Sequence, residues 1–467
     1  MITSSKKYFI FLFSLVVLLV ACGCEKPQPV EEPEPQQEEE QVEPADMSLI
    51  QKAVVITDDC LWSGKPQVTI HITNPNAAQV KVGISGKITS DMRKTVAEVT
   101  DSIEIAGKSE VDYILTTTEN LAPGFYKANC YVEGKSAGTL HFGIDVFDIV
   151  SAPDKQPDYD QFWQAAKDQL AAIDMQANLI ELPNKSTEKR KVYLVELRSV
   201  PDGLEGEPVI VRGYYCEPQD GQPHPVLMHF YGYDYQNTTA KVECPSGNGS
   251  DYAEFYLSHR GQYINNRPES SREPDGLGDL KNIYGDWCTY EFGHKDSYYY
   301  RGAFMDCVRA VDFMATRPTS DMNHLFAEGS SQGGALSYAA AALSNYPFTA
   351  ICANVAFLGD FPDYFQIVDW PGSTAKAAAH AAGMTDEEMY IFLSYFDTKN
   401  LATRIRCGVL ATSGGKDTTC PPHTNIAPYN NLLTPAENKE YHFYPEMTHD
   451  YPKNWWNMIG NFWKKFM

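Results

Sequence analysis

Hydrophobic and polar residues alternate with a period of two through the first part of the chain. The alternation is clear at 68–73 and 80–84, and it returns after a turn at 121–132 and again at 139–146. This period places one face of a strand in a core and the other face in solvent. Several short strands within about 100 residues are typical of an immunoglobulin-like sandwich, which we predict for residues 48–150.

The sequence of this β domain contains no catalytic constellation. His71 and His141 fall on polar steps of the alternation, so we expect both at the surface. Three roles are open for the domain: a spacer, a carbohydrate contact, or a surface that packs on the rest of the chain. The spacer is the simplest of the three.

The pattern changes after Ser151-Ala152-Pro153. An amphipathic helix follows through Leu170, and we expect Asp158 near its start to cap free backbone N–H groups. Strand-like and helix-like stretches then alternate, the clearest being 224–230, 303–314 and 407–412. This order predicts a doubly wound α/β domain over residues 151–467.

The N-terminus has the pattern of a targeting segment. Lys6 and Lys7 precede an apolar run that ends at Ala21-Cys22, a small residue followed by a cysteine. The segment resembles a bacterial lipobox, which implies that residues 1–21 are a lipoprotein signal peptide and that the Cys22 thiol is lipidated. An uncleaved membrane anchor and an ordinary signal peptide are the alternatives. A lipidated chain would be anchored to the membrane without spanning it.

An acidic, Pro-rich and Gln-rich stretch follows over residues 22–47. Between 25 and 46 the chain carries nine acidic side chains and one lysine, with few apolar residues. Such a composition cannot bury enough surface to fold, and its like charges repel one another. We expect an extended tether that holds the folded part away from the outer membrane, on the periplasmic or the surface face of the cell envelope.

Charge and cysteine spacing narrow the set of partners. The formal net charge of −23 argues against nucleic-acid binding and against an anionic membrane surface. The eleven cysteines form no Cys-x-x-Cys pair and no His/Cys ligand spacing, so we expect no metal site and no cofactor. A disulfide is compatible with an exported protein, but the spacing does not specify a pairing.

The candidate chemistry begins at 324–334, where a short apolar strand runs into a Gly-x-Ser-x-Gly turn and an Ala-rich helix. A serine at such a corner projects its hydroxyl above the sheet, within reach of a base. Ser331 holds the central position and is the candidate nucleophile, while Ser330 at the x position is the weaker candidate. An ordinary glycine-containing turn is the alternative interpretation.

A nucleophilic serine needs a histidine base and an acid that orients the base. In α/β-hydrolases these follow the serine in the order acid, then histidine, each after a later strand. Asp417 comes after the strand at 407–412, and His449 comes after the last strand at 441–444. We therefore predict Ser331, Asp417 and His449 as a catalytic triad.

Other residues compete for the two partner roles. His442 lies within the last strand, and His423 follows a Pro-Pro pair, so His449 on its loop is the better base. Asp450 is the rival acid, but its adjacency to His449 in the sequence makes the required geometry awkward.

With these residues in place, the region from about 155 to 467 resembles the acetyl xylan esterase/cephalosporin C deacetylase family, carbohydrate esterase family 7. Six segments carry the likeness, 159–163, 260–262 (Arg-Gly-Gln), 295–302, 329–333, 394–397 and 417–422, together with a terminal histidine followed by an acid at 449–450. The resemblance implies an α/β-hydrolase fold and a metal-independent serine esterase. Its implied substrates are acetylated carbohydrates such as xylan or xylo-oligosaccharides.

The resemblance also assigns roles near the serine. It implies that the backbone N–H groups of Gln332 and Tyr233 form the oxyanion hole. We interpret Arg260, Gly261 and Gln262 as structural residues near the site, because a guanidinium can tie several loops together. Family members often form hexameric rings, so the resemblance leaves a homo-oligomer open, while the lipid anchor and the added β domain argue against the same ring.

Three positions depart from the family pattern. Tyr231 stands where the family has histidine, Asp450 replaces the glutamate after the catalytic histidine, and Ser258-His259 replaces an Asp-Val pair. No departure removes a catalytic group, but each bears on the shape of the pocket. Two other functions stay open: another α/β-hydrolase, such as an aromatic-ester esterase or a peptidase, and a glycan-binding lipoprotein with a vestigial hydrolase domain.

Overall fold

The computed structural model describes residues 44–234, 242–245, 251–262, 264 and 283–467. The signal segment, Cys22 and most of the expected tether therefore lie outside the described residues. Within the described ranges, no helix is both long enough and apolar enough to cross a bilayer. All nine cysteines from Cys60 to Cys420 are present as free thiols.

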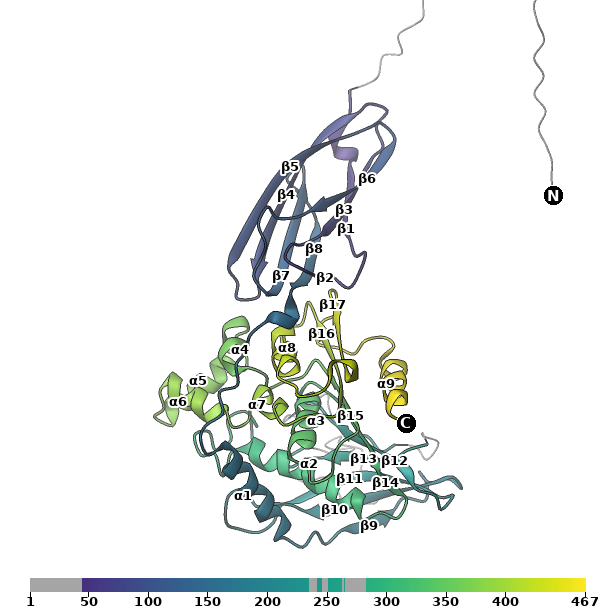
Figure 1. Ribbon diagram of the computed structural model, residues 1–467, viewed down its shortest axis with the longest axis vertical. Coiled ribbons are helices and arrows are strands. Elements are labelled where there is room, and N and C mark those ends of the chain that lie inside the picture. The colour runs from purple at the N-terminus through teal and green to yellow at the C-terminus, as the bar shows by residue number, and fades with distance from the viewer. Residues whose placement is uncertain (1–43, 235–241, 246–250, 263, 265–282) are drawn as a thin grey trace, which may run out of the picture. The chain divides into compact units, whose positions relative to one another are not determined.

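Two antiparallel-rich sheets form the N-terminal part of the described chain (Figure 1). Their strands are β1 (Gln51–Val55), β2 (Leu61–Trp62), β3 (Val68–Asn74), β4 (Val80–Ser90), β5 (Thr95–Ile105), β6 (Ser109–Leu115), β7 (Gly124–Val132) and β8 (Lys135–Ile144). One sheet has the order β1-β3-β6 and the other has the order β2-β8-β7-β4-β5. This is the two-sheet arrangement of an immunoglobulin-like sandwich.

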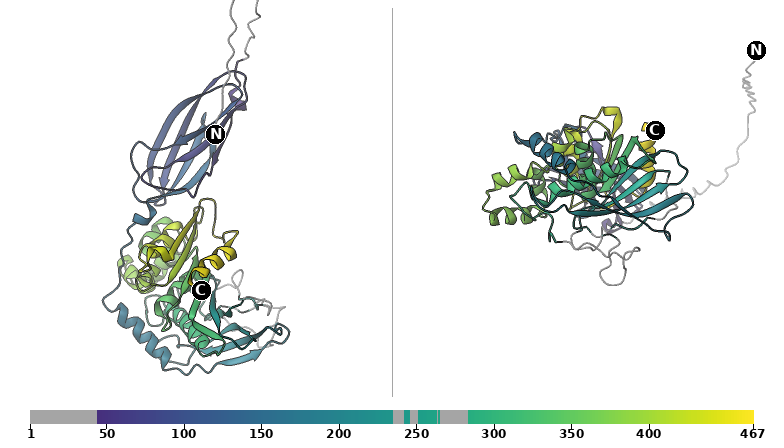
Figure 2. Two further views of the ribbon diagram at one scale, coloured as in Figure 1. Left: turned by 45° about the vertical axis from the view of Figure 1, so that its right-hand side comes forward. Right: turned by 90° about the horizontal axis from the view of Figure 1, so that it is seen from below.

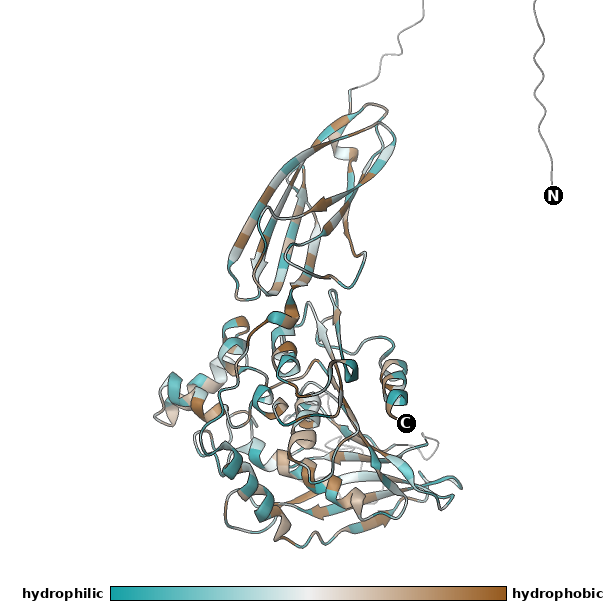
Figure 3. Cartoon of the chain, viewed as in Figure 1, coloured by the Kyte–Doolittle hydropathy of each residue, from teal (hydrophilic) through white to brown (hydrophobic). Residues whose placement is uncertain are grey.

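The sequence pattern explains the sandwich directly. Along β4, Val80, Val82, Ile84, Gly86 and Ile88 are buried, while the residues between them are exposed or half-buried. Figure 3 shows the same alternation of hydrophobic and hydrophilic residues along the strands. The buried face of each sheet meets the other in a shared core.

A nine-stranded mixed sheet forms the rest of the fold. Its strands are β9 (Asn178–Glu181), β10 (Arg190–Arg198), β11 (Ile210–Pro218), β12 (His224–Phe230), β13 (Ala253–Ser258), β14 (Ser320–Ser330), β15 (Ala350–Asn354), β16 (Gly408–Gly414) and β17 (Lys439–Tyr444). The order is β17-β16-β15-β14-β12-β13-β11-β10-β9. Strands β12 to β17 are parallel to one another. Strands β9 to β11 form an antiparallel edge that joins the sheet at β13.

Helices cover both faces of this sheet (Figure 2). They are α1 (Tyr159–Ala171), α2 (Tyr299–Ala315), α3 (Gln332–Leu343), α4 (Phe361–Ile367), α5 (Gly372–Ala381), α6 (Asp386–Leu393), α7 (Thr398–Ala402), α8 (Pro422–Asn430) and α9 (Trp455–Trp463). Phe326 of β14 packs with α9, whereas its neighbours Leu325 and Ala327 belong to the core cluster on the α2 and α3 side. The predicted α/β-hydrolase fold with a preceding all-β region is confirmed.

The start of α1 differs from the expectation. Asp158 is the N-cap residue of α1, but its carboxylate makes no capping hydrogen bond. It binds Lys295 Nζ at 2.5 Å and also accepts a hydrogen bond from Tyr395. A cation and a phenol compete successfully with the free N–H groups of the helix, because a charge-assisted hydrogen bond is stronger than a neutral cap.

The sandwich and the α/β part lie within one unit, Ala45–Met467, and contact each other directly. Arg93 Nη2 donates to the Ile367 carbonyl at 3.0 Å, and the rings of Phe125 and Phe443 lie 5.6 Å apart. The surface position expected for His141 is wrong. A Cβ added to Gly415 would lie 2.8 Å from His141 Cβ, so this histidine faces the α/β part at close range.

Candidate active site

The Ser331 corner has the backbone of a strained strand-to-helix turn. Ser331 lies between β14 and α3 with φ +57° and ψ −122°, a conformation that L-residues rarely adopt. Its N–H donates to the Asn354 carbonyl at 2.9 Å, and its carbonyl accepts from the Phe357 N–H at 3.0 Å. These bonds hold the strain in place. The turn therefore lifts the Ser331 side chain out of the sheet, as the motif predicts.

The glycines beside Ser331 are required by close backbone approach. A Cβ at Gly329 would lie 2.3 Å from the Gly333 carbonyl oxygen, inside any permitted contact distance. A Cβ at Gly333 would lie 2.2 Å from the Phe230 carbonyl oxygen at the end of β12. Glycine at 333 thus lets the first turn of α3 touch the end of β12.

Asp417 and His449 meet at the carboxyl ends of β16 and β17. His449 Nδ1 and Asp417 Oδ2 are 2.8 Å apart, and the Asp417 side chain is fully buried. The other carboxylate oxygen, Oδ1, accepts the N–H groups of Thr419 and Cys420, both at 2.8 Å. The carboxylate is therefore fixed in place and holds the imidazole with Nε2 free to face a substrate.

The rival residues lie elsewhere. The Asp450 carboxylate accepts its own neighbour's N–H, from Tyr451 at 2.7 Å, and the Asp450 carbonyl accepts from Asn354. His442 Nε2 binds Glu440 at 3.0 Å on the partly exposed β17. His423 is buried against Asp360. Of the candidate acids and bases weighed from the sequence, the structure brings only Asp417 and His449 together.

Ser331 and His449 are both described, and no hydrogen bond joins the Ser331 hydroxyl to the imidazole. The serine hydroxyl instead interacts with the buried Cys420 thiol. Burial, and then the nearby Asp417 charge, raise the pKa of this thiol well above its usual value, so it stays protonated. Hydrogen bonds between nucleophile and base are commonly loose until substrate binds.

The two expected oxyanion donors belong to the two segments that touch at Gly333, which are the start of α3 and the end of β12. Gln332 is the first residue of α3, so its N–H is one of the free donors at a helix N-terminus. Tyr233 follows β12, whose end touches Gly333. Tyr233 also donates its hydroxyl hydrogen to Asp286. Gln332 is thus adjacent to Ser331 in the chain, and the Tyr233 side chain is anchored three residues beyond the end of β12.

The Gln332 side chain is fully buried and held at both ends. Tyr300 donates to Gln332 Oε1 at 2.9 Å, and Gln332 Nε2 lies 2.9 Å from His259 Nε2. His259 Nδ1 lies 2.8 Å from the Tyr299 hydroxyl, which donates to the Arg260 carbonyl at 2.7 Å. Only one arrangement satisfies all these donors: a neutral His259 that accepts from Gln332 at Nε2 and donates from Nδ1.

The electrostatics agree with that arrangement. Burial lowers the pKa of His259 to about 4, so the ring is neutral at ordinary pH. His259 occupies one of the positions at which the sequence departs from the family pattern. Sequence reasoning noted the departure but not its consequence, which is a hydrogen bond to the residue after the nucleophile.

Arg260 makes the contacts of a scaffold residue. Its guanidinium binds Asp306 at 2.8 and 2.9 Å, Asp202 at 2.8 Å and the Val200 carbonyl at 3.0 Å. Gly302 leaves room for it, since a Cβ there would lie 2.1 Å from Arg260 Nη1. Gln262 Nε2 donates to the Gly232 carbonyl at 3.2 Å, next to Tyr233. Gly261, with φ +74°, makes the turn between them.

An aromatic wall lines the Tyr233 side of the site. The Tyr233 ring lies 5.2 Å from Trp287, 5.7 Å from Trp370 and 6.2 Å from Phe357 between ring centroids. Trp370 stacks on Phe357 at 5.7 Å with 3° between the ring planes. Phe357 is tied to Ser331 through its backbone N–H. These aromatic residues escaped the sequence analysis, because they come from loops with no shared motif.

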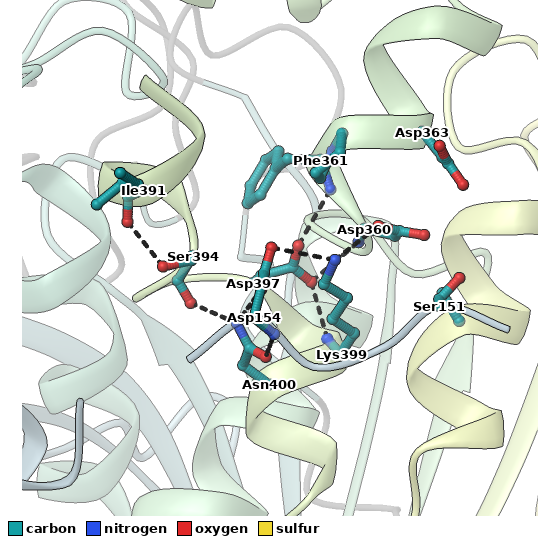
Figure 4. Close-up of polar contacts among 12 residues, drawn as sticks. Ser151, Asp154, Asp360, Phe361, Asp363, Ile391, Ser394, Asp397, Lys399 and Asn400 are labelled. Atoms are coloured by element: carbon teal, nitrogen blue, oxygen red, sulfur yellow. Dashed lines mark hydrogen bonds and ion pairs between the residues drawn. The ribbon is translucent and has the colours of Figure 1, made fainter. Parts of the chain in front are cut away.

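A second group of charged side chains converges in the described chain. Asp360, Asp363 and His423 place one ligand atom each within 4.8 Å of the others, the kind of spacing that a metal ion needs. Figure 4 shows Lys399 directed at Asp360, with a separation of 2.8 Å. Asp397 accepts the backbone N–H groups of Asp360 and Phe361 at 2.9 and 3.0 Å.

Charges within this group already balance one another. Burial would lower the pKa of His423, but hydrogen bonds to Asp360 and Asp363 outweigh it and raise the pKa to about 9. Burial would raise the pKa of Asp360, but His423 and Lys399 hold it well below its usual range. A protonated His423 and Lys399 supply the cations that the carboxylates require. These side chains therefore form an ion-pair cluster.

The fold and the site define a carboxylic ester hydrolase of the α/β-hydrolase class. A model of the acetyl xylan esterase (AXE1) family matches residues 148–466, and the chain belongs to this family. It is 26% identical over 320 residues to the acetyl esterase Axe7A of Xylanibacter ruminicola, covering 68% of this chain and 69% of that protein.

Two solved structures share the α/β part. The acetyl xylan esterase from Paenibacillus sp. is 27% identical with a TM-score of 0.55, covering 69% of this chain and 98% of that chain. Acetyl xylan esterase 1 from Thermoanaerobacterium sp. is 20% identical with a TM-score of 0.55, covering 68% of this chain and 97% of that chain. The family match begins at residue 148, so strands β1 to β8 lie outside it.

Proposed function

We propose that this chain is a serine esterase that removes acetyl groups from acetylated carbohydrates through an acetyl-Ser331 intermediate. The observation that carries the proposal is the buried Asp417 carboxylate bound to His449 at 2.8 Å. Asp417 and His449 follow the neighbouring strands β16 and β17, and Ser331 follows β14 of the same sheet. The order of these three residues along the chain is that of α/β-hydrolases.

In the first half-reaction the Ser331 oxygen attacks the acetyl carbonyl carbon. His449 Nε2 takes the hydroxyl proton, and Asp417 stabilises the imidazolium by accepting from Nδ1–H. Negative charge develops on the former carbonyl oxygen, where the N–H groups of Gln332 and Tyr233 receive it. Such a donor commonly contributes about a hundredfold or more to kcat.

The tetrahedral intermediate collapses when the sugar oxygen leaves. His449 returns its proton to that oxygen, so the alcohol departs neutral and acetyl-Ser331 remains. Water then enters, His449 removes its proton, and the same two N–H groups stabilise the second oxyanion. Release of acetate restores the Ser331 hydroxyl and neutral His449.

The aromatic residues around Tyr233 support a small acyl group. Trp287, Phe357 and Trp370 crowd the Tyr233 ring at centroid distances of 5.2 to 6.2 Å. Rings packed this closely leave little room for an acyl chain longer than acetyl, because an added methylene must displace a neighbour. The relatives named for acetyl and acetyl xylan esterase activity point to the same substrates, acetylated xylan or xylo-oligosaccharides.

We further propose that the mature protein is a lipoprotein of the outer membrane, anchored through Cys22. The proposal is supported by the lipobox-like sequence and the acidic stretch at 22–47. An envelope-anchored esterase would meet polysaccharide fragments at the cell boundary. Labelling with a radioactive fatty acid, compared between wild type and Cys22→Ala, tests this proposal; label retained by the variant contradicts it.

The enzymatic proposal is tested by acetate release from a panel of substrates. The panel holds acetylated xylo-oligosaccharides, acetylated cephalosporin, p-nitrophenyl acetate, p-nitrophenyl butyrate and a feruloyl ester. We expect acetylated sugars to be turned over and the butyryl and feruloyl esters to be poor substrates. Ser331→Ala should abolish all turnover, while the neighbouring Ser330→Ala serves as the matched control. Activity retained by Ser331→Ala contradicts the proposal.

A further inference from the structure

A cavity of about 530 Å³ lies where the sandwich meets the α/β part. The sandwich side is formed by the segment 89–93 and by strands β7 and β8, and the other side by 367–370 and the loop at 415–418. Its volume is that of pockets that enclose small ligands. The loop at 415–418 includes Asp417, so the cavity borders the candidate catalytic acid.

Trp370 joins this cavity to the active site. Its side chain lines the cavity and is 37% exposed. The ring stacks on Phe357 and meets Tyr233 at 5.7 Å, and the Phe357 N–H donates to the Ser331 carbonyl. One side chain therefore touches both the aromatic wall beside the nucleophile and the open space against the sandwich.

The walls of the cavity carry aromatic and hydrogen-bonding side chains of the kind that bind sugars. Trp370 provides exposed aromatic surface, Phe125 and Phe443 line the walls as nearly buried rings, and the exposed Lys127 and Thr418 add hydrogen-bonding groups. Sugar rings have apolar C–H faces and a rim of hydroxyls, so they match an aromatic surface edged by polar side chains.

The charges of the walls favour a neutral ligand. Arg93 is 3.3 Å from Asp369 and donates to the Ile367 carbonyl, so its charge is balanced within the wall. Asp91 and the exposed Lys127 both line the cavity from the sandwich side. Because the cavity walls carry both positive and negative side chains, they give no preference for an anionic ligand over an uncharged one.

We propose that this cavity binds neutral sugar residues of an acetylated oligosaccharide, adjacent to the sugar whose ester is cleaved. The sandwich then supplies one wall of the substrate site and selects for chain length. The inference rests on the proposed function. It also gives β1 to β8 a role in specificity beyond that of a spacer, although they lie outside the matched family region.

The test compares kcat/KM on three substrates: p-nitrophenyl acetate, acetylated xylose and acetylated xylotetraose. Thr89→Trp fills the cavity from the sandwich side, and Lys127→Ala removes a hydrogen-bonding group. Thr100→Trp on β5 and Lys81→Ala on β4, both exposed and away from the cavity, are the matched controls. All four substitutions lie in the sandwich and leave the residues around Ser331 unchanged.

We expect Thr89→Trp to lower kcat/KM on the tetraose about tenfold through a higher KM, and Lys127→Ala to lower it about threefold. Turnover of p-nitrophenyl acetate and of acetylated xylose should stay at the wild-type rate in both variants and in the controls. If Thr89→Trp does not fold, Lys127→Ala alone decides the question.

Two results overturn the inference and can be told apart. If the tetraose and the two small substrates change together, or none changes, the cavity does not bind the sugar chain. If wild type hydrolyses p-nitrophenyl acetate but releases no acetate from either sugar, the proposed function itself is wrong. A loss confined to the tetraose supports both the function and the subsite.

Discussion

Two Asp–His pairs in this chain have nearly the same geometry and very different surroundings. His449 and Asp417 are 2.8 Å apart, and His423 and Asp360 are 2.9 Å apart. The His449 side chain is 29% exposed on a loop after β17, whereas that of His423 is 7% exposed and shares its carboxylate with Lys399. A short Asp–His contact is therefore not sufficient to identify a catalytic pair. The histidine also needs an accessible nitrogen and a nucleophile nearby.

The largest effect separating the two pairs is expected from Asp417→Asn. The amide can donate to His449 Nδ1 and stabilise the wrong tautomer, which leaves Nε2 protonated and unable to act as a base. We expect kcat for acetate release to fall about ten-thousand-fold, with the thermal midpoint close to that of wild type. Steady-state kinetics with p-nitrophenyl acetate measure the first quantity and calorimetry the second. A loss below tenfold would remove Asp417 from the mechanism.

The same substitution at the other pair, Asp360→Asn, should do the reverse. It leaves Lys399 and His423 charged in a buried cluster with one carboxylate fewer, and such a loss costs about 3 kcal/mol of unfolding free energy. Denaturant unfolding at pH 7 gives this value. The kcat of the folded variant should equal that of wild type. A kcat lowered as strongly as in Asp417→Asn would contradict the structural role of this cluster.

The ion-pair cluster also predicts how stability depends on pH. The pKa of His423 is about 9 in the folded protein, whereas a histidine without these partners has a pKa of 6.5. The folded state therefore binds this proton more tightly, and the resulting stability is complete below pH 6.5 and lost as pH rises through 9. The predicted loss is on the order of 3 kcal/mol.

Comparing the unfolding free energies of wild type and His423→Gln isolates the contribution of His423 protonation. Asp91, Asp360, Asp363, Asp397 and Lys399 face or adjoin His423 in wild type and variant alike. His229, with a pKa of about 9, titrates over the same range in both proteins. Unfolding free energies from pH 6 to pH 9.5 should therefore fall more steeply in wild type. Parallel curves would show that His423 does not titrate in the cluster.

A smaller effect is expected at His259. His259→Leu removes the acceptor for Gln332 Nε2 and should lower kcat about tenfold with little change in KM, because the Gln332 N–H would be less well aligned with the oxyanion. His259→Gln, which keeps an acceptor, should recover part of the loss. His442→Leu on β17 is the matched control. Because the pKa of His259 is about 4, wild-type kcat should show no titration of this ring above pH 5. If His259→Leu and His259→Gln changed kcat and KM to the same extent as each other, His259 would have a structural role only.

The parts of the site that follow recognisable strands could be predicted from the sequence. Ser331, Asp417 and His449 each follow a recognisable strand, so the approach of Asp417 and His449 was predictable from strand order and from the geometry of a parallel sheet. The nine-stranded α/β fold followed from the same alternation of strands and helices. Local patterns suffice where each residue's position depends on the element that precedes it.

The remaining contacts depend on tertiary packing. Gln332 and His259 are 73 residues apart, and nothing near either one signals the bond between them. Asp158 had a local role available as a cap, but Lys295 offers a stronger partner from 137 residues away. His141 lies on a polar step of β8, yet the loop at Gly415 covers it. In each case a partner distant in sequence overrides the local preference.

The central claim is that the Asp417–His449 pair, and not the His423–Asp360 pair, serves a nucleophilic Ser331. Fluorophosphonate labelling followed by peptide mass mapping tests this most directly. We expect a single labelled peptide carrying the modification on Ser331, retained in Ser330→Ala and His423→Gln and lost in His449→Ala. Label on another residue, or undiminished labelling of Ser331 in His449→Ala, would contradict it.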